Sequence, residues 1–217
     1  MYLSRVEINQ RKRETLRALA SPQILHAAIE ACFSSEETVK YRNLWRIDKL
    51  NNSLYLILQS EIKPDFTHII EQFGWIEQKW ETKTYDEFMS RLQNGQVWMF
   101  RLQANPAHSK NIEKGSRGKV FGHVTIDSQR KWLADRAAKC GFEIVQTPDG
   151  NLNFDVAQCE TRKFWRQGEM VTLETAVFEG ALRIIDEESL LHAMRNGIGR
   201  AKAYGCGLLT LARQSDG

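Results

Sequence analysis

The chain has 217 residues, of which 42% are hydrophobic and 10% aromatic. This is enough apolar material for a core, and the composition excludes a disordered or collagen-like chain. The formal charge of +3 neither requires nor excludes a polyanionic partner. The length fits one large domain or two smaller ones of about 100 residues each.

The sequence shows neither a membrane segment nor a metal-binding motif. No apolar run reaches the roughly 18–20 residues that cross a bilayer, and charges interrupt the N-terminus where a signal peptide needs an apolar stretch. We therefore expect a cytoplasmic protein with no membrane partner. The four cysteines form no Cys-x-x-Cys pair and the five histidines no His-Glu-x-x-His motif, so we expect no metal and no cofactor.

The small net charge is unevenly distributed. Residues 1–96 carry 13 basic and 13 acidic side chains, whereas residues 97–217 carry 17 basic and 14 acidic ones. Within the second half, residues 101–139 hold nine basic against three acidic side chains. Such clusters set the field that a partner feels within about 10 Å. A solvated charged face is the alternative interpretation of each cluster.

The first half predicts three helices and three strands. An alternating pattern with β-branched residues indicates the first strand, and Ser21-Pro22 is typical of a helix N-cap followed by proline at the first helical position. The expected elements are a strand over 2–8, a short helix ending near 20, a helix from 22 to about 33, strands over 44–47 and 54–58, and a helix over 66–73. Residues 75–93 give no clear pattern.

The second half predicts a similar order with additional hairpin material. Asp127 and Asp186 are expected to cap helices that end at Gly141 and Gly197. The expected strands cover 97–102, 142–145, 152–156, 170–178, 182–185 and 208–212, with a turn at Glu179-Gly180 and an exposed loop over 107–119.

Each half thus approximates the order β-α-β-β-α-β. This order predicts an α+β fold of two tandem ferredoxin-like (RRM-like) domains with antiparallel sheets, over residues 1–94 and 95–217. RNA-recognition modules and small-molecule enzymes both use this fold, so the fold alone does not decide the function.

A glycine-rich segment near the C-terminus carries the strongest functional signal. Four glycines surround two cations, an arrangement in which backbone N–H groups and basic side chains suit phosphate oxygens. The residues are Gly197, Gly199, Arg200, Lys202, Gly205 and Gly207. The segment follows a helix and enters a strand, which is the reverse of a dinucleotide-binding loop. A tight helix-to-strand connection packed on the sheet is the alternative.

The sequence Gly-Ile-Gly-Arg-Ala-Lys-Ala-Tyr-Gly-Cys-Gly-Leu-Leu over residues 197–209 resembles the signature of CRISPR-associated repeat-processing endoribonucleases. The match is closest to the CasE type, a subunit of the Cascade complex. Further stretches that agree with this type lie at residues 1–4, 44–46, 100–106 and 177–180. The resemblance implies two ferredoxin-like domains, as the element order predicts independently.

The resemblance implies metal-independent cleavage of one phosphodiester beside a repeat hairpin. The RNA 2′-hydroxyl attacks the adjacent phosphorus and leaves a 2′,3′-cyclic phosphate and a 5′-hydroxyl. His26 matches the histidine to which the family assigns a role in this step. Imidazole exchanges protons near neutral pH, as this chemistry requires. On a helical wheel, His26 lies about 110° from the centre of the apolar stripe, at the border between core and solvent.

The residues beside His26 depart from the family pattern. Relatives often carry a tyrosine where this chain has Gln23, and some carry an arginine where it has Ala27. Gln23 cannot act as an acid or base, although its amide could donate to a phosphate oxygen. The proton partner of His26 therefore stays open between Lys40, Tyr41 and the basic stretch over residues 11–17.

Two basic segments are candidates for RNA binding. The first is the probable hairpin between Val156 and Met170, which matches a basic RNA-binding element of the family and carries Arg162, Lys163 and Arg166. The second is the loop with Lys110, Lys114, Arg117 and Lys119, for which a solvated loop is an equal alternative.

The expected partners are a CRISPR repeat RNA hairpin and the other Cascade subunits, with a monomer when free. The acidic segment over 61–90 is expected to face away from RNA. The leading hypothesis is an endoribonuclease that stays on its product. The alternatives are a non-catalytic subunit that binds the same hairpin and, less favoured, a small-molecule enzyme on a ferredoxin-like fold.

Overall fold

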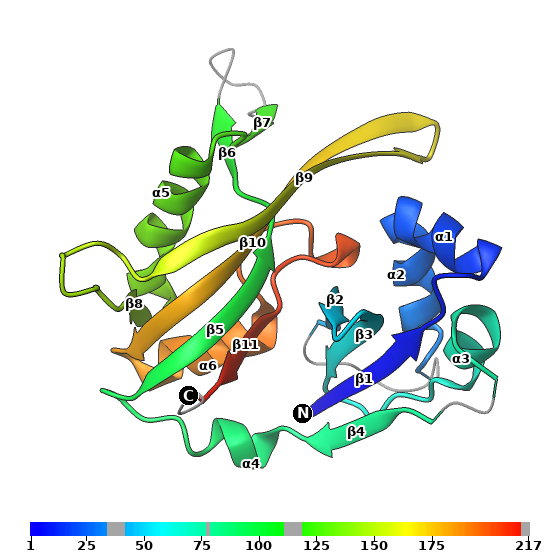
Figure 1. The fold of residues 1–217 in the computed structure, drawn as a ribbon, viewed down its shortest axis with the longest axis horizontal. Coiled ribbons are helices and arrows are strands. Elements are labelled where there is room, and N and C mark those ends of the chain that lie inside the picture. The colour runs from blue at the N-terminus through cyan, green and yellow to red at the C-terminus, as the bar shows by residue number, and fades with distance from the viewer. Residues whose placement is uncertain (34–41, 77–78, 111–118, 214–217) are drawn as a thin grey trace.

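The first half forms a four-stranded antiparallel sheet with strand order β2-β3-β1-β4. The computed structural model describes residues 1–33, 42–76, 79–110 and 119–213. The strands of this sheet are β1 (Tyr2–Ile8), β2 (Leu44–Leu50), β3 (Ser53–Ser60) and β4 (Glu81–Thr84). The order is that of a ferredoxin-like unit, with the first and third strands in the centre (Figure 1).

Three helices cover one face of this sheet: α1 (Arg13–Ala20), α2 (Pro22–Glu30) and α3 (Thr67–Phe73). Their apolar sides meet the sheet in a core that contains Val6, Ile29 and Phe66. Proline stands at the start of α2 as predicted, but the Ser21 side chain makes no capping hydrogen bond. Its backbone N–H instead ends α1, so one residue connects the two helices without room for a separate cap.

Residues 75–93, which gave no clear pattern, contain β4 and the short helix α4 (Asp86–Met89). The β4 sequence Glu-Thr-Lys-Thr is polar and forms the edge of the sheet, so it lacks the apolar alternation that marks a strand. Only pairing with β1 makes it a strand.

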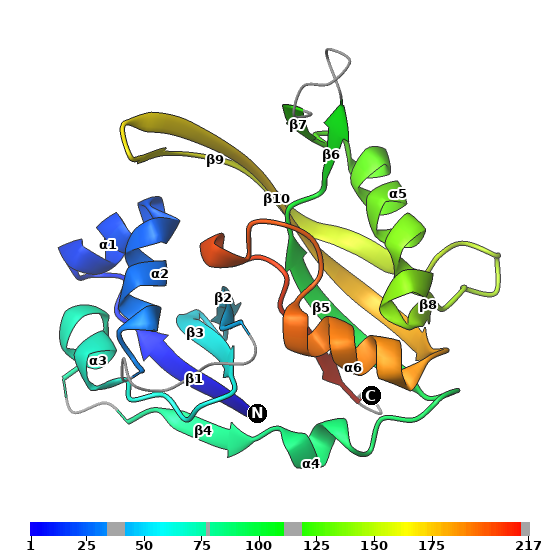
Figure 2. The same ribbon diagram turned by 180° about the vertical axis from the view of Figure 1, so that it is seen from behind.

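The second half forms a sheet with the order β11-β5-β10-β8, and β9 pairs with β10 beside β8. Its strands are β5 (Val97–Ala104), β8 (Phe142–Ile144), β9 (Phe154–Arg166), β10 (Glu169–Ile184) and β11 (Leu209–Ala212). The helices α5 (Ile126–Ala137) and α6 (Glu187–Asn196) pack on one face of it (Figure 2). The predicted fold of two ferredoxin-like units with antiparallel sheets is confirmed.

The predicted turn at Glu179-Gly180 is wrong. β10 continues through both residues, and Gly180 pairs with Phe100 on one side and Phe154 on the other. A Cβ atom at Gly180 would overlap the carbonyl oxygen of Asn153. The glycine therefore permits a close approach between strands rather than a turn.

Two further local predictions are corrected. The side chain of Thr125, not that of Asp127, caps α5 by accepting from the backbone N–H of Ser128. The segment over 107–119 is not simply a loop, because its ends form a hairpin of β6 (Ala107–Lys110) and β7 (Lys119–Gly122). The Asp186 cap of α6 and the positive φ of Gly141 and Gly197 agree with the prediction.

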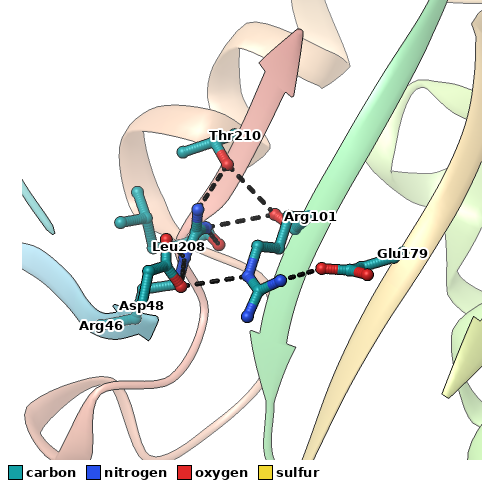
Figure 3. A network of polar contacts seen from close by, with 6 residues as sticks. All are labelled: Arg46, Asp48, Arg101, Glu179, Leu208 and Thr210. Atoms are coloured by element: carbon teal, nitrogen blue, oxygen red, sulfur yellow. Dashed lines mark hydrogen bonds and ion pairs between the residues drawn. The ribbon is translucent and has the colours of Figure 1, made fainter. Parts of the chain in front are cut away.

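A buried polar network joins the two sheets (Figure 3). The Arg46 guanidinium donates to Asp48 at 2.8 and 2.9 Å, to the carbonyl oxygens of Leu208 at 3.1 Å and Arg101 at 3.2 Å, and to Thr210 Oγ1 at 2.7 Å. Arg101 in turn binds Asp48 at 3.0 Å and pairs with Glu179. These bonds hold β2 of the first sheet against β5 and β11 of the second.

The segment between the sheets contributes to the second core. Tyr85, Met89 and Leu92 pack among the apolar side chains of the second half. The division into domains over 1–94 and 95–217 stays a prediction. None of the described helices has the length and apolar character needed to span a bilayer.

Candidate active site

His26 lies on the solvent border of α2, as the helical wheel predicts. Its side chain is 39% exposed, whereas Leu25 and Ile29 on the same helix are buried in the core. His26 Nδ1 lies 3.7 Å from Glu30 Oε1, one turn further along the helix. Glu30 therefore biases the orientation of the imidazole ring and leaves its Nε2 atom for another partner.

The glycine-rich segment lies directly against this helix. Its central turn is the 3-10 helix η2 (Lys202–Tyr204), which contacts both α2 and β2. Burial and the nearby charge of Arg42 lower the pKa of the Lys202 ammonium below its usual value. Two cations from distant parts of the sequence thus lie near each other beside the helix that carries His26.

The four glycines of the segment all adopt positive φ, which favours glycine. A Cβ atom on Gly205 would lie 3.0 Å from the Trp45 ring, and one on Gly197 would lie 2.7 Å from a Leu44 methyl group. The segment therefore packs closely on β2 of the other sheet. The alternative of a tight, packed connection describes these glycines well.

The expectation that the glycine N–H groups hold phosphate is corrected for three of them. The N–H groups of Gly197, Gly205 and Gly207 donate to the carbonyl oxygens of Ala193, Lys202 and Gln103. They are already used inside the protein and do not offer a phosphate site. Among the charged members of the segment, Arg200 donates to Ser109 Oγ at 3.0 Å and so joins the segment to β6.

The basic hairpin of β9 and β10 projects beyond its sheet toward the side where α1 and α2 lie (Figure 1). Lys163 and Arg166 are exposed on it, whereas Arg162 is half-buried and its Nε donates to Glu160 at 2.8 Å. Phe164 is buried and packs edge-to-face on Tyr204 of η2, with ring centroids 4.9 Å apart. The structure thus brings the part of the hairpin near its turn to the glycine-rich segment.

The second basic candidate is described only in part. Lys110 and Lys119 pair as backbone neighbours at the ends of β6 and β7. Lys114 and Arg117 lie outside the described residues, as do Lys40 and Tyr41 among the candidates for the proton partner of His26.

Sequence reasoning missed Glu30 and Arg42 as neighbours of the site. The spacing of four residues between His26 and Glu30 on a helix could have indicated the first pair. No local pattern relates Arg42 to Lys202, because only the packing of η2 on α2 and β2 brings them together. In the described ranges, no group of three or more His, Cys, Asp or Glu side chains could hold a metal ion.

Comparison with known proteins assigns the chain to a family. Residues 1–213 match the model of the family described as "CRISPR associated protein". The chain belongs to this family.

The relatives of this CRISPR-associated protein match along their whole length. The "CRISPR-associated endoribonuclease Cse3" of Thermus thermophilus is 28% identical over 98% of this chain and 100% of the relative. The "CRISPR system Cascade subunit CasE" of Escherichia coli is 30% identical over 98% of this chain and 99% of the relative. A solved structure of Cse3 bound to a 19-nucleotide RNA superposes with a TM-score of 0.81 at 27% identity, covering 98% of this chain and 100% of that one.

Proposed function

We propose that this protein is an endoribonuclease that cleaves CRISPR precursor RNA at its repeat stem-loops. The observation that carries the proposal is the position of His26 on a helix packed against the glycine-rich segment, in a chain of this family. The Escherichia coli relative bears the name of a Cascade subunit. By analogy, this protein stays bound to its product hairpin as part of such a complex.

The reaction is a metal-independent transesterification. The 2′-oxygen attacks the adjacent phosphorus and loses its proton, the bond from phosphorus to the 5′-oxygen breaks, and that oxygen gains a proton. The products are a 2′,3′-cyclic phosphate and a 5′-hydroxyl. The imidazole of His26 performs one of the two proton transfers, because imidazole both accepts and donates protons near neutral pH. The half-buried position on α2 leaves its ring accessible to a bound strand.

The cations beside α2 stabilise the charge that develops on the phosphate oxygens. Lys202 is partly desolvated and lies within electrostatic reach of Arg42, so its ammonium acts in a less polar environment than bulk water. Lys202 also joins the candidates for the second proton transfer, for which Gln23 is chemically unsuited. The exposed Lys163 and Arg166 of the hairpin bind the RNA backbone.

Incubation of the protein with its cognate repeat RNA in EDTA tests the proposal. We expect a shortened RNA that ends in a 2′,3′-cyclic phosphate, detected by mass spectrometry. His26→Ala is expected to slow cleavage by about 10²–10⁴-fold, the usual contribution of a general acid or base, with little change in RNA affinity. His192→Ala, at an exposed position on α6, is the matched control. Cleavage by His26→Ala at the wild-type rate contradicts the assignment of His26.

A second candidate function is a non-catalytic subunit that binds the same hairpin. Gln23 and Ala27 favour it, because relatives often carry a tyrosine and some an arginine at these positions. This function gives salt-dependent binding of the hairpin without a shortened RNA on a denaturing gel.

A further inference from the structure

A cleft of about 320 Å³ lies between the two sheets, beside the helix that carries His26. One wall comes from the first half and includes Pro22 and Leu25 of α2 and Trp45 of β2. Leu25 is the immediate neighbour of His26 along the helix. The volume is at the lower end of the roughly 300–1,000 Å³ typical of ligand pockets.

The floor of the cleft is the face of the second sheet opposite α5 and α6. On β5, Phe100 and Leu102 point into the core under α5 and α6, so the alternating residues Arg101 and Gln103 line the cleft. Gln158 and Thr175 of the neighbouring strands line it too. A polar sheet face thus opposes a largely apolar wall.

Gln103 is the buried glutamine of the floor, and its side chain takes part in no hydrogen bond among the described residues. The residue is only 6% exposed. Its backbone carbonyl is used, because it accepts from the N–H of Gly207 at 2.7 Å. The side chain lines the cleft, so its carbonyl oxygen and its NH₂ group are both available to a ligand that supplies a donor and an acceptor.

The charges of the floor are already compensated by ion pairs. Arg101 pairs with Asp48 and Glu179, and Arg162 pairs with Glu160. The floor therefore offers amide groups more than free positive charge, which suits an uncharged planar ligand with hydrogen-bonding edges better than a phosphate. A nucleobase has this chemistry, with flat faces for the apolar wall and an edge for Gln103.

We propose that the cleft binds the base of one unpaired nucleotide that adjoins the RNA hairpin, and that the Gln103 amide hydrogen-bonds to its edge. The inference rests on the proposed function, because it requires RNA to lie along α2. A base held in the cleft places its sugar and phosphate close to the helix that carries His26. The cleft then contributes to the choice of the cleavage position.

The test measures RNA binding in a His26→Ala background, so that cleavage does not interfere. The probes are the repeat stem-loop with its unpaired flanks, and a series in which each unpaired position in turn is abasic. We expect one abasic position to weaken binding about tenfold, the size expected for the loss of two neutral hydrogen bonds. Gln103→Leu is expected to weaken binding of the intact RNA by a similar factor and to abolish the difference between intact and abasic RNA.

Gln72→Leu, on the exposed surface of α3, is the matched control and should behave like the background protein. Gln103→Glu is the second variant, in case leucine prevents folding; it removes the amide donor and should weaken binding selectively for the intact RNA. Equal affinity for every abasic RNA, or equal losses for intact and abasic RNA in both Gln103 variants, overturns the inference. Base-dependent binding without cleavage by the wild-type protein overturns only the catalytic proposal.

Discussion

At the scale of single residues, the candidate active site depends on His26 and Lys202 and on the charged side chains near them. His26 has Glu30 at 3.7 Å, and Lys202 has Arg42 within electrostatic reach. Ala201, which precedes Lys202, adopts the left-handed conformation with φ 59°, a region that non-glycine residues rarely occupy. The backbone thus accepts local strain immediately before the lysine that it presents to α2.

The pH dependence of cleavage tests the role of Lys202. Because its pKa is lowered from the ordinary 10.5, the ammonium loses its proton at a lower pH than a free lysine does. We expect kcat/KM to fall on the alkaline side below pH 10.5, and Lys202→Arg to move that fall to higher pH because arginine stays protonated. Lys131→Arg on α5 is the control. An unchanged alkaline limb in Lys202→Arg contradicts the assignment.

At the scale of elements, the glycine-rich segment connects α6 to β11 and packs against β2. Its glycines touch Leu44 and Trp45 of β2, and Tyr204 packs on Phe164 of the basic hairpin. η2 therefore contacts both α2 and the hairpin, although the three lie far apart in the sequence. Close packing of the segment is what holds Lys202 beside α2.

Substitution of Gly205 by alanine tests this packing. Gly205 has φ +81° and Gly150 has φ +80°, but only at Gly205 does an added Cβ meet another residue, the Trp45 ring at 3.0 Å. Gly150→Ala should therefore cost about 1–2 kcal/mol of unfolding free energy from backbone strain alone. Gly205→Ala should cost about 1–3 kcal/mol more from overpacking and should also slow cleavage. Denaturant unfolding measures both, and equal losses in the two variants contradict the packing role.

At the scale of the whole molecule, the Arg46 network fixes one sheet against the other (Figure 3). Arg46 and Asp48 are both buried, and Gln59 adds a hydrogen bond of 2.7 Å to the carbonyl oxygen of Met194. Because Leu208 and Thr210 directly follow the glycine-rich segment, the same arginine anchors the end of that segment. The cleft and the candidate active site both lie along this junction.

Removal of the Arg46 side chain takes two hydrogen bonds from Asp48 and one each from the carbonyl oxygens of Leu208 and Arg101, and leaves Arg101 as the remaining side-chain donor to Asp48. We expect Arg46→Ala to lower the free energy of unfolding by roughly 3–5 kcal/mol, the usual cost of breaking a buried ion pair. Arg46→Lys should recover part of it, since lysine keeps the charge but cannot reach all four partners. Urea unfolding provides the measurement and exposed Arg91→Ala the control. A loss below 1 kcal/mol for Arg46→Ala would mean that the network does not hold the sheets together.

Local sequence patterns predicted the features that depend on residues close together in the sequence. Apolar alternation marks β1 and continuous apolar stretches mark β3 and β5, and the side chain of Asp186 caps α6 through bonds to residues only two and three positions away. The border position of His26 follows from helical periodicity. The family signature over 197–209 also belongs to this level, because it is a contiguous run of residues.

Only the tertiary structure decided the features that depend on distant partners. Gly180 looked like a turn residue, yet it lies inside β10 because a neighbouring backbone approaches it closely. The N–H group of Gly207 looked free for phosphate, yet the carbonyl oxygen of Gln103 on β5 accepts from it. The electrostatic influence of Arg42 on Lys202 and the cleft around Gln103 arise where the two sheets pack together. The sequence by itself determined most of the elements, the family and the candidate histidine. Packing of the two sheets decided the surroundings of that histidine, because contacts between distant segments leave no local pattern.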